Sequence, residues 1–153
     1  MHIFFAIAWL GGSLYLSFVL GPRSATLSPS AAMEFFARVG RPTIRYLSIV
    51  GSLTIVFGLI LLYVYFGSDY ATWPLSLDLG FTLGLVAFLD GLLFTAPAAS
   101  KAADIANNFV GKVQPGPPPP EFLAATKEVA FSSVIGTMLL IITAVFMVST
   151  AFY

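Results

Sequence analysis

The chain has 153 residues, of which 58% are hydrophobic and only 9% are charged. A soluble domain carries about 25% charged residues, so this composition predicts an integral membrane protein. Seven Lys and Arg residues balance seven Asp and Glu residues, and the chain has one His and no Cys. These counts exclude the basic surface of a nucleic-acid-binding protein, disulfides and thiolate metal sites.

Four apolar stretches are long enough to cross a hydrocarbon core about 30 Å thick, which takes about 20 helical residues. They cover residues 3–20, 44–66, 75–96 and 129–151. The first has the position of a secretory signal, but no basic residue precedes it and Pro22 and Arg23 follow it, so we expect a retained helix. We therefore predict an all-α fold, in which residues 1–153 form a single membrane domain, a four-transmembrane-helix bundle.

The cations predict the orientation of these spans. They lie in the connection between the first two spans, at the start of the second span, and in the connection between the last two spans, namely Arg23, Arg38, Arg41, Arg45, Lys101, Lys112 and Lys127. The connection between the second and third spans has none. By the positive-inside rule, both long connections are cytoplasmic and both termini lie outside the cell membrane.

Each long connection contains a second, shorter helical pattern. Ser28 is a typical N-cap, Pro29 suits the first helical position, and Gly40 is a typical stop. Met33 and Phe36 fall on one face of this stretch, and residues 98–110 form a similar one. We therefore predict short interfacial helices in the two cytoplasmic connections.

The two halves of the chain are weakly similar. Trp9 and its neighbours align with Phe88, and Gly51 aligns with Gly136. This similarity predicts a parallel two-helix repeat of residues 1–66 and 75–153.

Asp90 interrupts the third span. A carboxylate at that depth is costly unless it is paired, neutral or hydrated, so it is a candidate functional residue. It either takes part in a proton or cation step or forms a structural intramembrane charge pair, for which Arg45 is the expected partner.

His2 is the one imidazole in the chain. It is a candidate ligand of haem or copper whose other ligands come from a second chain, or else a side chain that hydrogen-bonds water and headgroups. One ligand does not make a site, so we expect no cofactor bound by this chain alone.

Small residues are spaced at helical intervals in the third and fourth spans. Close approach of a second helix is expected along such a face, which here comprises Gly80, Gly84, Ala87, Gly91, Ser132 and Gly136. The face serves either packing within the bundle or docking to another membrane protein.

The first span, from His2 through Trp9 to Gly12, resembles the opening helix of the copper-resistance protein D (CopD)-like membrane proteins. That helix has a His at its start and an aliphatic-Trp-aliphatic-Gly-Gly step. Phe36, Arg38 and residues 53–61 resemble the second helix of the same family, so the resemblance covers about the first 66 residues. It implies a four-helix membrane domain associated with copper or haem, with His2 as the candidate ligand.

Phosphate-binding glycine loops, serine nucleophiles with a base and paired catalytic carboxylates are absent from the sequence, so we do not expect an enzyme. We predict a non-catalytic accessory subunit of a larger membrane complex, of a respiratory or other redox type, with other membrane subunits and the lipid bilayer as partners. The alternatives are a CopD-like copper- or haem-handling protein that uses His2 and a proton-coupled transporter that uses Asp90.

Overall fold

The computed structural model describes residues 1–67, 69, 72–110 and 117–150, and within these residues the regular structure is entirely helical. Four helical segments are long and apolar enough to cross a membrane: His2–Ser24, Pro29–Phe66, Leu75–Phe109 and Pro120–Ser149. We refer to them as the first to fourth segments. The all-helical, four-segment prediction is therefore confirmed, whereas Lys112 and the last residue of the predicted fourth span lie outside the described residues.

Two of the segments change their helical pitch along their length. The first consists of α1 (His2–Tyr15), the π-helical turn η1 (Leu16–Leu20) and α2 (Gly21–Ser24). The third consists of α4 (Leu75–Asp90), the π-helical turn η3 (Gly91–Thr95) and α5 (Ala96–Phe109). The second and fourth segments are single helices, α3 (Pro29–Phe66) and α6 (Pro120–Ser149).

Each π-helical turn ends two residues before a proline, Pro22 in α2 and Pro97 in α5. A proline ring inside an α-helix collides with the carbonyl group four residues earlier, and that carbonyl belongs here to Phe18 or Leu93, inside the π-helical turn. The wider π turn gives the ring room. This explains how both segments continue past the predicted spans 3–20 and 75–96 and through the proline that follows each of them.

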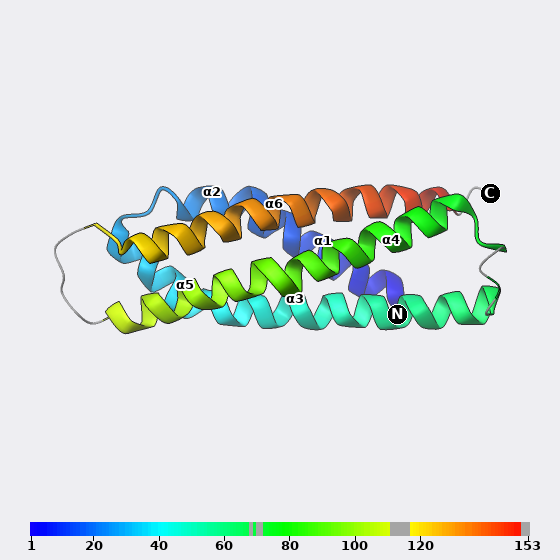
Figure 1. The fold of residues 1–153 in the computed structure, drawn as a ribbon, viewed down its shortest axis with the longest axis horizontal. Helices are drawn as coiled ribbons and strands as arrows, with labels where there is room; N and C mark the ends of the chain where they lie inside the picture. Colours follow the sequence, from blue (N-terminus) through cyan, green and yellow to red (C-terminus); the bar gives the residue numbers. More distant parts are fainter. Residues whose placement is uncertain (68, 70–71, 111–116, 151–153) are drawn as a thin grey trace.

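Successive segments run in opposite directions (Figure 1). The turn between α2 and α3 lies at the end of the bundle where α5 ends and α6 begins, and the α3–α4 connection lies at the other end (Figure 1). The six described cations therefore gather towards the end that holds the two long connections. α1 begins beside the interior of α3, because His2 contacts Thr54 and Gly58 well before α3 ends at Phe66.

Two apolar clusters hold the bundle together. Trp9, Val50, Ala87 and Leu140 form a cluster at mid-length, with one residue from each segment. The second cluster lies at the cation-rich end, where α5 presents a buried alanine face to α3 and α6. It contains Ala102, Ala106, Phe122 and Ala125, with Met33, Phe36, Ala37 and Ile105 packed around it.

The structure corrects the predicted helix at 28–40. Ser28 caps α3 by accepting a hydrogen bond from the amide of Ala31, as expected. However, Gly40 does not stop the helix, which continues through Pro42 to Phe66. Gly40 is instead a point of close packing, since a Cβ atom there would lie 3.2 Å from the Cβ of Ala103.

The stretch at 98–110 is likewise not a separate helix, because α5 is continuous with η3. In the stretch at 28–40, the predicted apolar face carries Phe36. This side chain packs on Phe122 of α6, with ring centroids 5.5 Å apart. Both stretches are therefore extensions of long helices that pair with each other.

Candidate functional site

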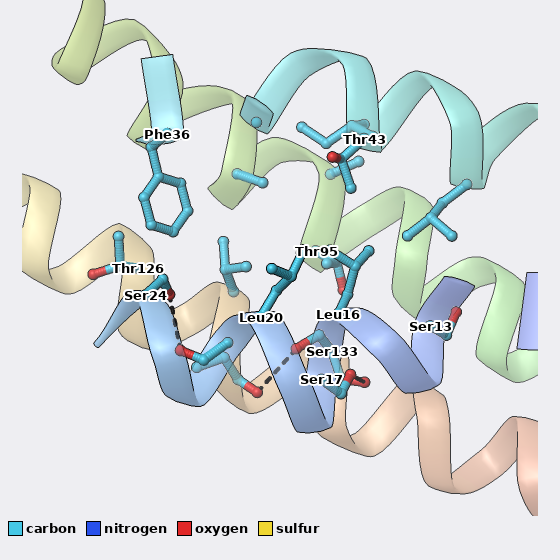
Figure 2. A pocket seen from close by; sticks show the side chains of 18 of the residues that line it. Ser13, Leu16, Ser17, Leu20, Ser24, Phe36, Thr43, Thr95, Thr126 and Ser133 are labelled. Atoms are coloured by element: carbon cyan, nitrogen blue, oxygen red, sulfur yellow. Dashed lines mark hydrogen bonds between the residues drawn. The ribbon is translucent and has the colours of Figure 1, made fainter. Parts of the chain in front are cut away.

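A cavity of about 460 Å³ lies between the four segments, from the mid-length cluster towards the cation-rich end. Most of its lining is apolar, and hydroxyl side chains from all four segments interrupt that lining (Figure 2). These include Ser13, Ser17, Thr43, Thr95, Ser133 and Thr137. Asp90 is the one carboxylate among the lining residues.

The cavity exists because the first segment changes partner along its length. α1 packs on α3, and Gly12 allows the close contact, since a Cβ atom there would lie 3.1 Å from the ring of Tyr46. One turn later, η1 packs on α6 instead. Figure 1 shows the first segment crossing from α3 at its start to α6 at its end. A wedge therefore opens between the end of the first segment and the first half of α3.

Hydroxyl groups fix the contact between η1 and α6. The Ser17 hydroxyl donates to the carbonyl oxygen of Ser133 at 3.1 Å and lies 2.8 Å from the Thr137 hydroxyl. Thr137 in turn lies 2.7 Å from the same carbonyl oxygen. Both Ser17 and Thr137 are buried, so these hydrogen bonds hold one wall of the cavity in place.

Asp90 is the last residue of α4 and lies where the helix changes to η3. The hydroxyl of Ser132 donates to its carboxylate, with distances of 3.1 Å to Oδ1 and 3.0 Å to Oδ2. Since that hydroxyl has one hydrogen, the Thr95 hydroxyl at 2.7 Å must be the donor to Ser132. Gly136 leaves room for the carboxylate, because a Cβ atom there would lie 3.0 Å from Oδ2.

The expected pair between Asp90 and Arg45 is not formed. Among the described residues, ion pairs join Arg38 to Glu34 and Arg41 to Asp104, at the cation-rich end. Arg45 is exposed, and Asp90 has a hydroxyl partner instead of a cation. A carboxylate offers about four acceptor positions, so one bifurcated hydrogen bond uses only part of its capacity.

His2 links α1 to α3. Its Nδ1 lies 2.9 Å from the carbonyl oxygen of Thr54, and its ring packs against Gly58, where a Cβ atom would lie 3.1 Å from Cε1. Among the described residues, no group of three or more His, Cys, Asp or Glu side chains is arranged to hold a metal ion. The contact explains His2 as a link between helices, and its role as a ligand stays a prediction.

Most of the predicted small-residue face is used inside the bundle. Cβ atoms at Gly80 and Gly84 would lie 3.2 Å from Met147 and Thr143 of α6, respectively. Ala87 is 4% exposed and belongs to the mid-length cluster. Ser132 and Gly136 contact Asp90, whereas a Cβ atom at Gly91 would meet nothing within 4 Å and this residue lines the cavity.

Sequence reasoning did not predict the cavity or its hydroxyl groups. The signal was present, because Ser13 and Ser17 are spaced by one helical turn in an apolar span, as are Ser133 and Thr137. Hydroxyl groups in apolar helices also occur as ordinary interhelical links, so their spacing alone does not indicate a cavity.

Comparison with family models, with curated protein sequences and with solved structures found no match to this chain.

Proposed function

We propose that this protein is an integral membrane carrier that binds a small solute in the interior cavity, with Asp90 as the charged group that recognises it. The observation that carries the proposal is a carboxylate that lines a cavity of about 460 Å³ and has no cation beside it among the described residues. Binding sites for small molecules have volumes of about 300–1,000 Å³, mostly apolar walls and a few polar groups. Ionisable residues inside membrane spans are usually functional.

The distribution of charge supports a membrane orientation for this carrier. α3 has 38 residues, so it is about 57 Å long and exceeds the hydrocarbon core by more than 20 Å. Its charged residues, from Glu34 to Arg45, all lie in its first half. In this proposal the cation-rich end, with the paired extensions of α3, α5 and α6, projects into the cytoplasm, and the cavity extends towards that side.

The cysteine-free sequence allows a test that needs no knowledge of the solute. Ser133→Cys places a thiol on the cavity wall, and Val134→Cys places one on the neighbouring residue, which is 37% exposed on the outside of α6. Each variant is treated with membrane-impermeant methanethiosulfonate reagents of either charge, in right-side-out and in inside-out vesicles. A carrier exposes its site to both sides in turn, so the cavity thiol is expected to react from both sides.

The thiol at residue 134 is the matched control and faces lipid in this proposal, so it should react from neither side. Reaction of the Ser133→Cys thiol from one side only, or from neither, would contradict a carrier. The proposal also requires that water reaches the thiol at residue 133 through the cavity. If the thiol at residue 134 reacted as fast as the thiol at residue 133, this requirement would not be met.

The accessory-subunit function remains a prediction with less support, because the glycine face on which it depended is largely covered by α6. The CopD-like function depends on His2, whose Nδ1 already contacts Thr54. Native purification in mild detergent, followed by identification of every co-purifying chain, tests both.

A further inference from the structure

We infer that the solute of this cavity is a monovalent organic cation with an aromatic or bulky apolar body. The inference builds on the proposed carrier function and names its substrate class. The carboxylate of Asp90, the aromatic walls and the apolar wedge between the first segment and α3 favour such a solute.

Two charged residues line the cavity, Asp90 and Lys127. Lys127 is exposed on α6 and precedes Ser132, the partner of Asp90, by five residues, or about 7.5 Å along the helix. Solvent screens the exposed Lys127, whereas the half-buried carboxylate lies between helices, where electrostatic attraction is stronger. One positive charge is therefore the best complement to the site.

The walls favour an organic body over a bare ion. The rings of Trp9 and Phe88 both line the cavity and pack edge to face, with centroids 6.0 Å apart. Asp90 and Phe88 line the cavity from different faces of α4, because Phe88 packs on Trp9 and Gly51 whereas Asp90 contacts Ser132 and Gly136 of α6. Aromatic faces attract cations, and Trp does so most strongly. A volume of about 460 Å³ also far exceeds what a proton or a metal ion needs.

Metal ions are a poor fit for a second reason. Divalent cations take six or more oxygen ligands, several of them carboxylates, or a set of nitrogen and sulfur ligands. Among the described residues, no group of three or more His, Cys, Asp or Glu side chains meets this need. A single carboxylate with hydroxyl neighbours suits an ammonium or phosphonium group.

The wedge between the first segment and α3 fits an apolar body. Its lining includes apolar side chains from both elements, such as Leu20, Phe35 and Phe36. Walls of this kind keep the apolar body of a lipophilic cation out of water. The hydroxyl groups of Thr43 and Thr95 also line the cavity (Figure 2).

Two shape-matched probes test this inference on the purified full chain in mild detergent. Tetraphenylphosphonium and tetraphenylborate have nearly the same size and shape and opposite charges. Equilibrium dialysis with each ion measures binding, and detergent micelles without protein give the background. We expect the wild type to bind the phosphonium at least tenfold more tightly than the borate, because the carboxylate attracts one and repels the other.

Asp90→Asn should reduce phosphonium binding at least tenfold, and Asp78→Asn, in the first turn of α4 and outside the cavity, should leave it unchanged. Size-exclusion chromatography checks that both variants are folded. Should Asp90→Asn not fold, Trp9→Leu is the second variant, and its phosphonium binding should fall about threefold or more. Equal binding of the two ions by the wild type would overturn the inference, as would unchanged phosphonium binding in both cavity variants.

The result is separable from that of the thiol-labelling experiment. Reaction of Ser133→Cys from both sides without phosphonium selectivity would leave the carrier function intact and reject the organic-cation class. Labelling from one side only, combined with Asp90-dependent phosphonium binding, would reject transport and leave a cation-binding membrane protein.

Discussion

Two helix pairs in this bundle differ in how closely they approach. α4 and α6 form the closed pair, in which Gly80 and Gly84 bring the helices together against Met147 and Thr143. The first segment and α3 form the open pair, which is close at Gly12 and Gly58 and then diverges towards the cation-rich end. The positions of glycine therefore decide where these helices touch, and the cavity begins where the first segment leaves α3 for α6.

The largest expected loss of stability comes from disrupting the contact between α4 and α6. Gly84→Leu puts a side chain where a Cβ atom alone would be 3.2 Å from Cγ2 of Thr143. Overpacking of this kind costs about 3 kcal/mol, and the free energy of unfolding should fall by that amount, as measured by titration with SDS in mixed micelles. Gly11→Leu is the control, because a Cβ atom there meets nothing within 4 Å. Equal stability of the two variants would refute the distinction between buried and open glycines.

A smaller loss of stability is expected when the hydrogen bond between Ser132 of α6 and Asp90 of α4 is removed. Ser132→Ala removes the hydroxyl that donates to the carboxylate and leaves Asp90 without that partner. We expect a loss of about 1–2 kcal/mol, since an unsatisfied polar group in the interior costs about 1–3 kcal/mol. Ser133→Ala is the adjacent control and should cost less, because its hydroxyl donates only to the carbonyl oxygen of Ala130. The same SDS titration measures both variants, and a reversed order would exclude a special role for Ser132.

Loss of the hydrogen bond that links the first segment to α3 should lower the free energy of unfolding by a smaller amount. His2→Ala removes the contact between Nδ1 and the carbonyl oxygen of Thr54, and interhelical hydrogen bonds in membrane proteins average about 0.6 kcal/mol. We expect a loss of that size in the unfolding free energy, with partial recovery in His2→Asn, which keeps a donor. Absorption spectra of the purified protein add a second readout. A haem Soret band in the wild type that disappears in His2→Ala would establish His2 as a ligand and reject a purely structural role.

The smallest effect is expected at the exposed end of the bundle. Arg41 pairs with Asp104 across α3 and α5, and the two side chains are 52% and 53% exposed. Surface ion pairs contribute about 0–1 kcal/mol, so Arg41→Gln should lower stability by about 0.5 kcal/mol or less, and 0.5 M NaCl should remove the difference. Arg38→Gln, within one helix, is the comparison. A loss above about 2 kcal/mol at Arg41 would show that the extensions hold the bundle together more strongly than their exposure indicates.

Much of the fold could be predicted from the sequence, because its causes are local. Hydrophobic stretches of about 20 residues identify each of the four long apolar segments, and Ser28 with Pro29 identifies the start of α3. Helix ends were predicted less well. Gly40 and Pro42 are stop signals in a short helix, but packing of α3 against the alanine face of α5 outweighs them.

The site was harder to predict, since it depends on contacts between distant parts of the chain. Asp90 was identified because a carboxylate in an apolar span is unusual by itself. Its partner was predicted incorrectly, because charge favours Arg45 whereas helix packing brings Ser132 to it. The cavity depends on the divergence of the first segment from α3, and no periodicity in the sequence records that divergence.

The π-helical turns before Pro22 and Pro97 have a consequence for the register of each helix. A π turn accommodates one more residue than an α turn, and one residue corresponds to a rotation of about 100° around the helix axis. Deletion of a single residue from η1 would restore an ordinary α-helical turn and rotate everything beyond it, including Arg23, relative to Ser17. The extra residue in η1 and the extra residue in η3 therefore determine which side chains face the interior before and after each π-helical turn.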